Sequence, residues 1–245
     1  MILSGCQVRS VRDDDDTGNL GRNRGESPAD IYVQLATGYL QEGQTDTALR
    51  KVRQGLELDP RNARAHMVIA LIYERLGETG LAENHYAEAI GLEPKDPFIH
   101  NAYGSFLCKQ KNYAQALKEF EAAVSNPLYP TPHVALANAG VCARRAGELS
   151  RAEGYLRQAL QSDNKFPLAL SQMAIVSFET GNALSARAYL QRFLEVADPS
   201  PDMLWLGIRI ARELGNRALE AEYEGLLRQK FPDAREIQYL NESRR

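Results

Sequence analysis

The chain has 245 residues, of which 44% are hydrophobic and 25% are charged, and its formal net charge is −3. This balance is typical of a folded protein with a sizeable core. The small negative charge argues against a nucleic-acid partner, because such proteins carry a basic patch or stripe. No run approaches the roughly 18 apolar residues that a membrane-spanning helix needs, so the sequence predicts none.

The first part of the chain differs in composition from the rest. Residues 7–28 read QVRSVRDDDDTGNLGRNRGESP, with no hydrophobic periodicity and four consecutive aspartates. Such a segment has too little apolar surface to pack. As a Gly-rich and polar coil of about twenty residues, it would span roughly 25 Å on average. The sequence therefore predicts a flexible tether over residues 1–28.

A repeat with a period of about 34 residues follows this tether. Gly43, Gly77 and Lys111 are equally spaced, with Lys111 in place of the glycine. After two extra residues the series resumes with the same spacing at Gly147, Gly181 and Gly215. Five residues after the first five positions stands an alanine: Ala48, Ala82, Ala116, Ala152 and Ala186. This spacing predicts two helices per repeat, with a left-handed residue ending the first helix and a small residue where the two helices approach most closely.

The pattern resembles the tetratricopeptide repeat, which predicts an all-α fold. In the expected right-handed α-solenoid, each repeat buries its apolar face against its neighbour. We expect six repeats, at residues 29–62, 63–96, 97–130, 133–166, 167–200 and 201–234, followed by a C-terminal tail at 235–245. The two-residue insertion coincides with NPLYPTP, residues 126–132, where three prolines preclude a regular helix. Either an ordinary longer loop or a change of superhelical pitch would accommodate it.

The sequence contains no catalytic or metal-binding motif. The patterns G-x-x-x-x-G-K-[ST], H-E-x-x-H, G-x-S-x-G and C-x-x-C are absent. No histidine forms an i, i+4 pair with another histidine or cysteine, and we expect His66 and His100, at the fourth position of their repeats, to be half-buried packing residues. We therefore expect no enzyme, no cofactor and no metal site, and we place binding on the surface of the solenoid.

The resemblance also implies a binding groove. In tetratricopeptide-repeat proteins the first helix of each repeat lines a concave surface. Along the repeat frame, that surface would display Glu74, Asn101, Ser105, Lys109, Asn138, Arg144, Ser171, Gln172 and Phe178. The amides of Asn101 and Asn138 are suited to pair with the backbone of an extended partner segment. The alternative is that these are hydrated polar positions without a binding role.

The chain has three cysteines: Cys6, Cys108 and Cys142. If Cys6 carries a lipid, an even number remains, which suits one disulfide. Cys108 and Cys142 lie in the expected first helices of repeats three and four, which are neighbours in a solenoid. A bridge requires Cα atoms within about 7 Å. The alternative is two buried free thiols that act as small apolar groups.

Several stretches are more particular than a generic repeat. They are YVQLATGYLQEG (32–43), NAYGSFLCKQKNYAQAL (101–117), PLYPTP (127–132), NAGVCARRAGELSRAEGYL (138–156) and LGIRIARELGN (206–216). These stretches resemble the type IV pilus biogenesis lipoproteins of the PilF/PilW family, the pilotins. The resemblance covers residues 29–240 and includes the repeat count. Ala102 departs from the pattern, because a second asparagine is expected there.

The resemblance implies an outer-membrane lipoprotein that faces the periplasm of a Gram-negative bacterium. Its partner would be the secretin subunit, which it would bring to the outer membrane and help to assemble into the ring through which the pilus passes. Residues 3–6, LSGC, read as a lipobox with lipidation at Cys6. Gln7, in place of an aspartate, favours the outer membrane. Only Met1 and Ile2 precede the lipobox, so we expect the natural precursor to start upstream with an apolar run of about 7–15 residues.

Two other classes of protein stay open. One is a general periplasmic scaffold, for instance for cell-wall enzymes, and the other is a cytosolic adaptor in which MILSGC occurs by chance. An in-frame hydrophobic segment encoded upstream of Met1 would exclude the adaptor. We expect a protein partner and a lipid anchor, no nucleic acid and no small-molecule substrate, with a monomer as the default for a capped solenoid. We place the secretin on the first three repeats, nearest the tether.

Overall fold

The computed structural model describes residues 27–242, which form thirteen helices and no strand. The helices are α1 (Pro28–Gln41), α2 (Thr45–Leu58), α3 (Ala63–Leu76), α4 (Thr79–Leu92), α5 (Pro97–Lys109), α6 (Tyr113–Ser125), α7 (Pro132–Arg145), α8 (Leu149–Ser162), α9 (Pro167–Glu179), α10 (Ala183–Leu194), α11 (Pro201–Glu213), α12 (Arg217–Lys230) and α13 (Arg235–Glu242). The predicted lipidation site at Cys6 and most of the predicted tether lie outside the described residues.

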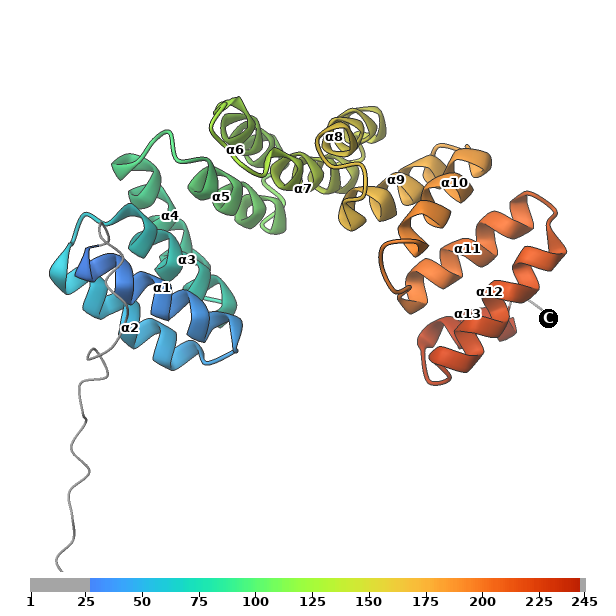
Figure 1. The fold of residues 1–245 in the computed structure, drawn as a ribbon, viewed down its shortest axis with the longest axis horizontal. Helices are drawn as coiled ribbons and strands as arrows, with labels where there is room; N and C mark the ends of the chain where they lie inside the picture. The colour runs from blue at the N-terminus through green and yellow to red at the C-terminus, as the bar shows by residue number, and fades with distance from the viewer. Residues whose placement is uncertain (1–26, 243–245) are drawn as a thin grey trace, which may run out of the picture.

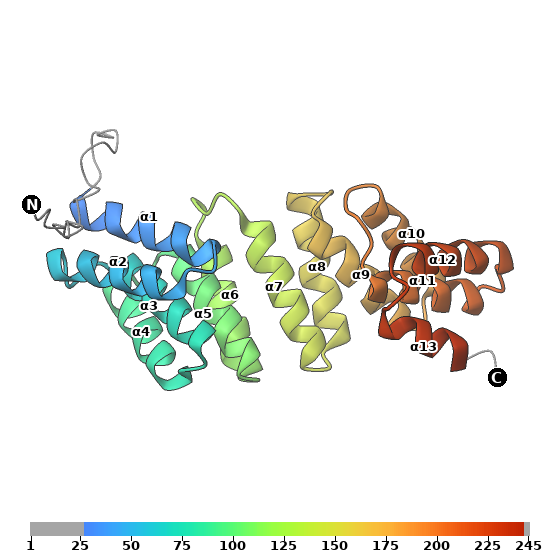
Figure 2. The same ribbon diagram turned by 90° about the horizontal axis from the view of Figure 1, so that it is seen from below.

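The helices stack as consecutive pairs that follow an arch (Figure 1). From α1 to α11, each odd-numbered helix contacts the next odd-numbered helix, whereas each even-numbered helix contacts only its neighbours in sequence. The odd-numbered helices therefore form a continuous layer. Figure 1 shows α5 and α7 on the inner side of the arch and α6 and α8 on the outer side, and Figure 2 shows the same stack from below. The predicted α-solenoid is confirmed.

The turn within each helix pair has the left-handed backbone that the repeat of glycines predicted. Gly43, Gly77, Gly147, Gly181 and Gly215 all have positive φ, between 64° and 81°. Lys111 adopts the same conformation, with φ 63°, although it has a side chain. The frame therefore persists through the replaced position, because the turn geometry is kept at the expense of some backbone strain.

A second small position brings the paired helices together. A Cβ atom built on Gly140 in α7 would lie 2.5 Å from Cγ of Leu156 in α8. A Cβ on Gly104 in α5 would lie 2.9 Å from the ring of Phe120 in α6. The buried alanine series of the even helices lies at the same interfaces, with Ala152 fully buried. The repeat pattern predicted the alanines at these interfaces but not the glycines.

The joint between the third and fourth helix pairs combines a long loop with a covalent bridge. Residues 126–131 form a non-helical loop of six residues, as do residues 195–200, whereas the corresponding loops at 59–62, 93–96 and 163–166 have four. Across the same joint, Cys108 in α5 and Cys142 in α7 form a disulfide, with their Cα atoms 5.7 Å apart. The bridge therefore ties the inner layer together at a joint where the connection between the helix pairs is lengthened.

The C-terminal end of the described chain is helical. Residues 235–242, predicted to be part of a C-terminal tail, instead form α13 and pack against α11 and α12. Leu240 is fully buried there, so α13 covers the apolar end of the last helix pair. Within residues 27–242, no helix combines the length and the apolar character needed to cross a bilayer.

Candidate functional site

The surface formed by α1, α3, α5, α7, α9 and α11 is called the odd-helix face below, and it is where the sequence analysis placed the groove. All nine predicted groove residues lie on four of these helices: Glu74 on α3; Asn101, Ser105 and Lys109 on α5; Asn138 and Arg144 on α7; Ser171, Gln172 and Phe178 on α9. Most of their side chains contact one another or the next odd helix, so the face is cross-linked by polar contacts.

Glu74 and Lys109 join α3 to α5. The Lys109 ammonium lies 2.5 Å from Oε1 of Glu74, whose side chain is 14% exposed. The other oxygen of Glu74 accepts a hydrogen bond of 3.2 Å from the hydroxyl of Tyr86 in α4. Burial and the neighbouring Glu74 carboxylate raise the pKa of Tyr86. The Glu74 carboxylate is thus engaged on both sides and holds two helix pairs together.

Asn101 and Asn138 join α5 to α7. The amide nitrogen of Asn138 donates to Oδ1 of Asn101 at 3.0 Å. Each side chain keeps unused capacity, the NH₂ group on Asn101 and the carbonyl oxygen on Asn138. The Ser105 hydroxyl donates to the Asn101 backbone carbonyl at 2.9 Å, and the Ser171 hydroxyl does the same to Leu168 at 3.0 Å. The two asparagines could therefore still pair with a partner backbone, while both hydroxyl protons are already used.

Two contacts join α7, α9 and α11. The Arg144 guanidinium donates to Oε1 of Gln172 at 3.1 Å and to Oε1 of Glu179 at 3.0 Å. The guanidinium of Arg209 lies over the ring of Phe178, 4.6 Å from its centroid. The first contact neutralises a cation on the face, whereas the second leaves the cation without a carboxylate.

A row of five residues at equivalent positions crosses the odd-helix face, and only Ser105 among them was predicted as a groove residue. Successive odd helices carry at equivalent positions Leu71, Ser105, Val141, Ile175 and Arg209. The first four are partly buried and Arg209 is exposed. Extending the register of Ser105 one repeat at a time, with allowance for the insertion at 126–132, would have found the other four. The row supplies apolar contact area next to the amides.

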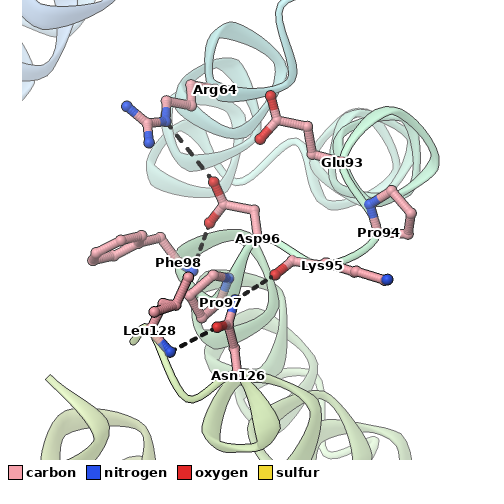
Figure 3. A pocket seen from close by; sticks show the side chains of 9 residues that line it. All are labelled: Arg64, Glu93, Pro94, Lys95, Asp96, Pro97, Phe98, Asn126 and Leu128. Atoms are coloured by element: carbon pink, nitrogen blue, oxygen red, sulfur yellow. Dashed lines mark hydrogen bonds and ion pairs between the residues drawn. The ribbon is translucent and has the colours of Figure 1, made fainter. Parts of the chain in front are cut away.

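A separate pocket of about 450 Å³, the Leu128 pocket, lies beside the N-terminus of α5 (Figure 3). Its wall includes Phe98, in the first turn of α5, and Leu128, in the loop 126–131. The Asn126 amide holds this loop, because it donates to the Lys95 carbonyl at 3.0 Å and accepts from the Leu128 backbone N–H at 2.9 Å. Leu128 is 86% exposed. No sequence pattern points to this pocket, because its walls come from loops far apart in the chain.

The Leu128 pocket also has a charged side. Asp96 caps α5, and it accepts hydrogen bonds from the backbone N–H groups of Phe98 at 2.7 Å and Ile99 at 3.3 Å. Nε of Arg64 lies 3.8 Å from the second Asp96 oxygen. Burial and the nearby Asp96 carboxylate raise the pKa of Glu93. The pocket therefore has an apolar wall on one side and the carboxylates of Glu93 and Asp96 on the other. Across residues 27–242, no group of three or more histidines, cysteines or acidic residues is placed to hold a metal ion.

The repeat chemistry and the helix arrangement define the class of protein. The tetratricopeptide-repeat family matches residues 33–97 and 100–165, which is more than half of the chain. The chain therefore belongs to the tetratricopeptide-repeat proteins, which agrees with the paired helices, the left-handed turn residues and the continuous odd-helix face.

Individual relatives within this class indicate a more specific family. The chain is 30% identical over 237 residues to the type IV pilus assembly protein PilF of Pseudomonas aeruginosa, an alignment that covers 96% of this chain and 92% of PilF. A crystal structure of PilW, described as a widely conserved type IV pilus biogenesis factor, superposes with a TM-score of 0.81, 32% identity and coverage of 88% of this chain and 99% of PilW. The structure of P. aeruginosa PilF superposes with a TM-score of 0.80 and 29% identity, and the match covers 88% of this chain and 97% of PilF. The chain belongs to the PilF/PilW family of type IV pilus biogenesis proteins.

Proposed function

We propose that this chain is a non-catalytic pilotin of the type IV pilus. It binds the secretin subunit, directs it to the outer membrane and promotes its assembly into a multimer. The observation that carries this proposal is the alignment with PilF, which extends over 96% of this chain and 92% of PilF. Such an alignment includes the whole solenoid rather than one repeat, so it supports a shared surface as well as a shared fold.

The proposed secretin site is the part of the odd-helix face that α1, α3, α5 and α7 form. It offers an amide pair with unused hydrogen-bonding groups, Asn101 and Asn138, next to the partly buried apolar side chains of Leu71 and Val141. An extended segment can use backbone hydrogen bonds for affinity and side-chain contacts for specificity. The proposed contact lies on the first three helix pairs and reaches the fourth through Asn138.

The proposed anchor is a lipid on Cys6, which would hold the solenoid at the periplasmic face of the outer membrane. As the flexible tether that the sequence predicts, the segment before Pro28 would let the odd-helix face reach a secretin subunit at a distance of roughly 25 Å from the bilayer. Two or more acyl chains are needed for stable anchoring, because one chain binds a membrane only marginally. The proposal therefore requires that Cys6 be processed and multiply acylated.

The test is a strain that lacks the gene and is complemented with the full-length coding region. The readout is the amount of heat-resistant secretin multimer in the outer membrane. We expect multimers to be lost without the gene, and Cys6→Ala to leave the secretin in the inner membrane. Ser105→Arg, which places a bulky cation on the odd-helix face, should reduce multimers, whereas Gln191→Arg, at an exposed position of α10, should not.

Normal multimers in the deletion strain would contradict the pilotin proposal and would leave a general periplasmic scaffold as the better description. If the deletion removes multimers but Ser105→Arg and Gln191→Arg behave alike, the secretin binds elsewhere on the chain. Circular dichroism and thermal unfolding of both purified variants establish that each is folded before the comparison is made.

A further inference from the structure

The last helix pair carries an unusual group on the odd-helix face. Terminal repeats of solenoids normally present a polar outer surface, because they end the apolar stack. Here α11 carries Trp205, the single tryptophan of the chain, and Arg209, four residues later. Positions i and i+4 of a helix are neighbours on one side. Together with Phe178 on α9, these residues are called the Trp205 cluster.

The Arg209 guanidinium of the Trp205 cluster is available to bind a ligand. Arg209 is exposed and its guanidinium lies over the Phe178 ring, 4.6 Å from the centroid. Within residues 27–242, no carboxylate pairs with Arg209. Stacking covers one side of the planar group and leaves its edge, which carries the N–H donors, for a ligand. An exposed guanidinium held in this way is pre-organised to bind a carboxylate.

The other charged side chains near the cluster either form ion pairs of their own or form no ion pair with Arg209. Arg144 donates to Glu179 at 3.0 Å, which occupies that carboxylate. Arg212, whose guanidinium lies 5.6 Å from the Trp205 ring, is paired with Glu220 at 2.6 Å and Glu224 at 3.2 Å. Glu213 follows Arg209 by four residues on the same side of α11, but it forms no ion pair with Arg209 within residues 27–242 and borders a pocket at the α9–α10 turn. The cluster therefore carries one positive charge that no carboxylate pairs with directly, that of Arg209.

The cluster also has apolar area. Trp205, Phe178 and Ile175 are all partly buried, and the Trp205 ring lies 6.1 Å from the ring of Tyr239 in α13. This contact fixes the indole while leaving part of it exposed. Tryptophan and arginine are among the residue types that most often dominate the binding energy of protein interfaces. An aromatic platform next to a free guanidinium matches a segment with an aromatic side chain beside an acidic one.

We propose that the Trp205 cluster is a second docking site, separate from the proposed secretin site on the first helix pairs, for an extended peptide segment in which an acidic residue follows an aromatic residue. The acidic side chain binds the edge of the Arg209 guanidinium. The aromatic side chain packs against Trp205 and Ile175. The proposal does not depend on the identity of the secretin or on the lipid anchor, because every group that would contact the peptide lies on α9 and α11.

The single tryptophan makes the test direct, since the intrinsic indole fluorescence of the protein reports on the cluster alone. The probe is an N-acetylated, C-amidated heptapeptide, Gly-Ser-Phe-Asp-Asp-Ser-Gly, and its matched control is Gly-Ser-Phe-Lys-Lys-Ser-Gly. We expect the acidic peptide to change the Trp205 emission in a saturable way at millimolar concentration. The basic peptide should bind at least about tenfold more weakly, because it places like charges together.

A charge exchange separates specific docking from general adhesion. Arg209→Glu should reverse the preference, so that the basic peptide binds the variant more tightly than the acidic one. Arg217→Glu changes the charge equally at an exposed position of α12 in the same helix pair, and it should leave both affinities within about twofold of the wild type. Phe178→Leu should weaken the acidic peptide several-fold, because the guanidinium loses its aromatic support.

Three results with the peptides would overturn the proposal. They are an emission that stays unchanged with the acidic peptide, equal affinities for the two peptides, and an Arg217→Glu variant that responds as Arg209→Glu does. A Trp205 emission that changes on dilution of the protein without peptide would show that a second copy of the chain covers the cluster, which would also overturn it. No secretin is present in the assay, so its outcome is independent of the proposed pilotin function.

Discussion

His66 in α3 and His85 in α4 face each other with their Nδ1 atoms 3.0 Å apart. Nε2 of His66 lies 3.1 Å from the carbonyl oxygen of Pro60 and donates its proton there, so Nδ1 of the neutral ring accepts from His85. One helix pair later, His100 occupies the position of His66, and Glu119 occupies that of His85, with Nδ1 and Oε2 2.7 Å apart. The same geometry thus brings two histidines together in one helix pair and a histidine and a carboxylate together in the next.

This difference predicts opposite responses to pH. Burial and His66 lower the pKa of His85, against a smaller opposite effect of Glu88. A group with a lowered pKa stabilises the fold above its unfolded pKa, about 6.5, and loses that contribution as the pH falls. The hydrogen bond to Glu119, with smaller contributions from the Pro94 carbonyl and Asp96, raises the pKa of His100. Its contribution is complete below about pH 6.5 and is lost as the pH rises through the folded pKa.

The measurement is the free energy of unfolding in urea at pH 5 and pH 8 for two matched variants. Relative to the wild type, His85→Gln should gain stability at pH 5 compared with pH 8, because it removes a group that resists protonation. His100→Gln should lose more stability at pH 5 than at pH 8, because it removes an ion pair that exists only when the histidine is protonated. Parallel pH profiles for the two variants would contradict the assignment.

Lys111 is a second position with a measurable consequence. Its φ of 63° lies in the left-handed region, where the equivalent residues of the other turns are glycines. We expect Lys111→Gly to stabilise the protein by about 0.5–1 kcal/mol, since relief of backbone strain exceeds the greater freedom of glycine in the unfolded chain. The reverse change at an equivalent turn, Gly147→Lys, should destabilise by about 1 kcal/mol. Urea unfolding of both variants checks the pair of signs.

Much of the fold could be predicted because its signals are local and periodic. A regularly recurring glycine identifies a turn wherever it stands, and the frame continued through Lys111 because the neighbouring repeats fixed it. The frame also placed Cys108 and Cys142 on adjacent odd helices, although their separation of 34 residues is two short of the 36-residue step at this joint, so that they do not occupy equivalent positions. The repeat pattern did not predict helix α13, because residues 235–242 continue no repeat, although Ile237 and Leu240 show helical spacing.

The contacts of the candidate site could be predicted only in part. The register placed Asn101 and Asn138 on the odd helices, but their mutual hydrogen bond depends on the angle and spacing of α5 and α7, which the sequence does not encode locally. The Leu128 pocket depends on one bond from Asn126 to the Lys95 carbonyl, 31 residues away. Arg209 lies in the register of Ser105 and could have been predicted from it, but its contact with the Phe178 ring depends on how α9 and α11 pack.

The disulfide predicts a stability effect at the joint between the third and fourth helix pairs. Cys108 and Cys142 enclose a loop with a sequence separation of 34 residues. On the chain-entropy estimate, closing a loop of this length stabilises a protein by about 3–4 kcal/mol. The free energy of unfolding should fall by that amount in the Cys108→Ser/Cys142→Ser double variant. Addition of a reductant should destabilise the wild type and leave the double variant unchanged, and an equal effect on both would mean that the bridge is absent in solution.

Gly140 provides the sharpest test of how the paired helices pack. A Cβ atom at this position would lie 2.5 Å from Cγ of Leu156, which is fully buried. Gly140→Ala should therefore destabilise by about 1–3 kcal/mol through overpacking, even though alanine is the better helix former. Gly154→Ala in α8, where an added Cβ meets nothing within 4 Å, should instead stabilise by about 0.5–1 kcal/mol.

A double-mutant cycle decides whether the Gly140 effect comes from Leu156. Leu156→Ala alone should cost about 2–5 kcal/mol, because it leaves a cavity in the core. In the double variant, the methyl group added by Gly140→Ala enters the space that Leu156 vacates. The cost of the double variant should therefore be lower than the sum of the two single costs by about 1 kcal/mol or more. Strict additivity in urea unfolding would mean that backbone shifts absorb the methyl group elsewhere, and the close approach of α7 and α8 would then not depend on this glycine.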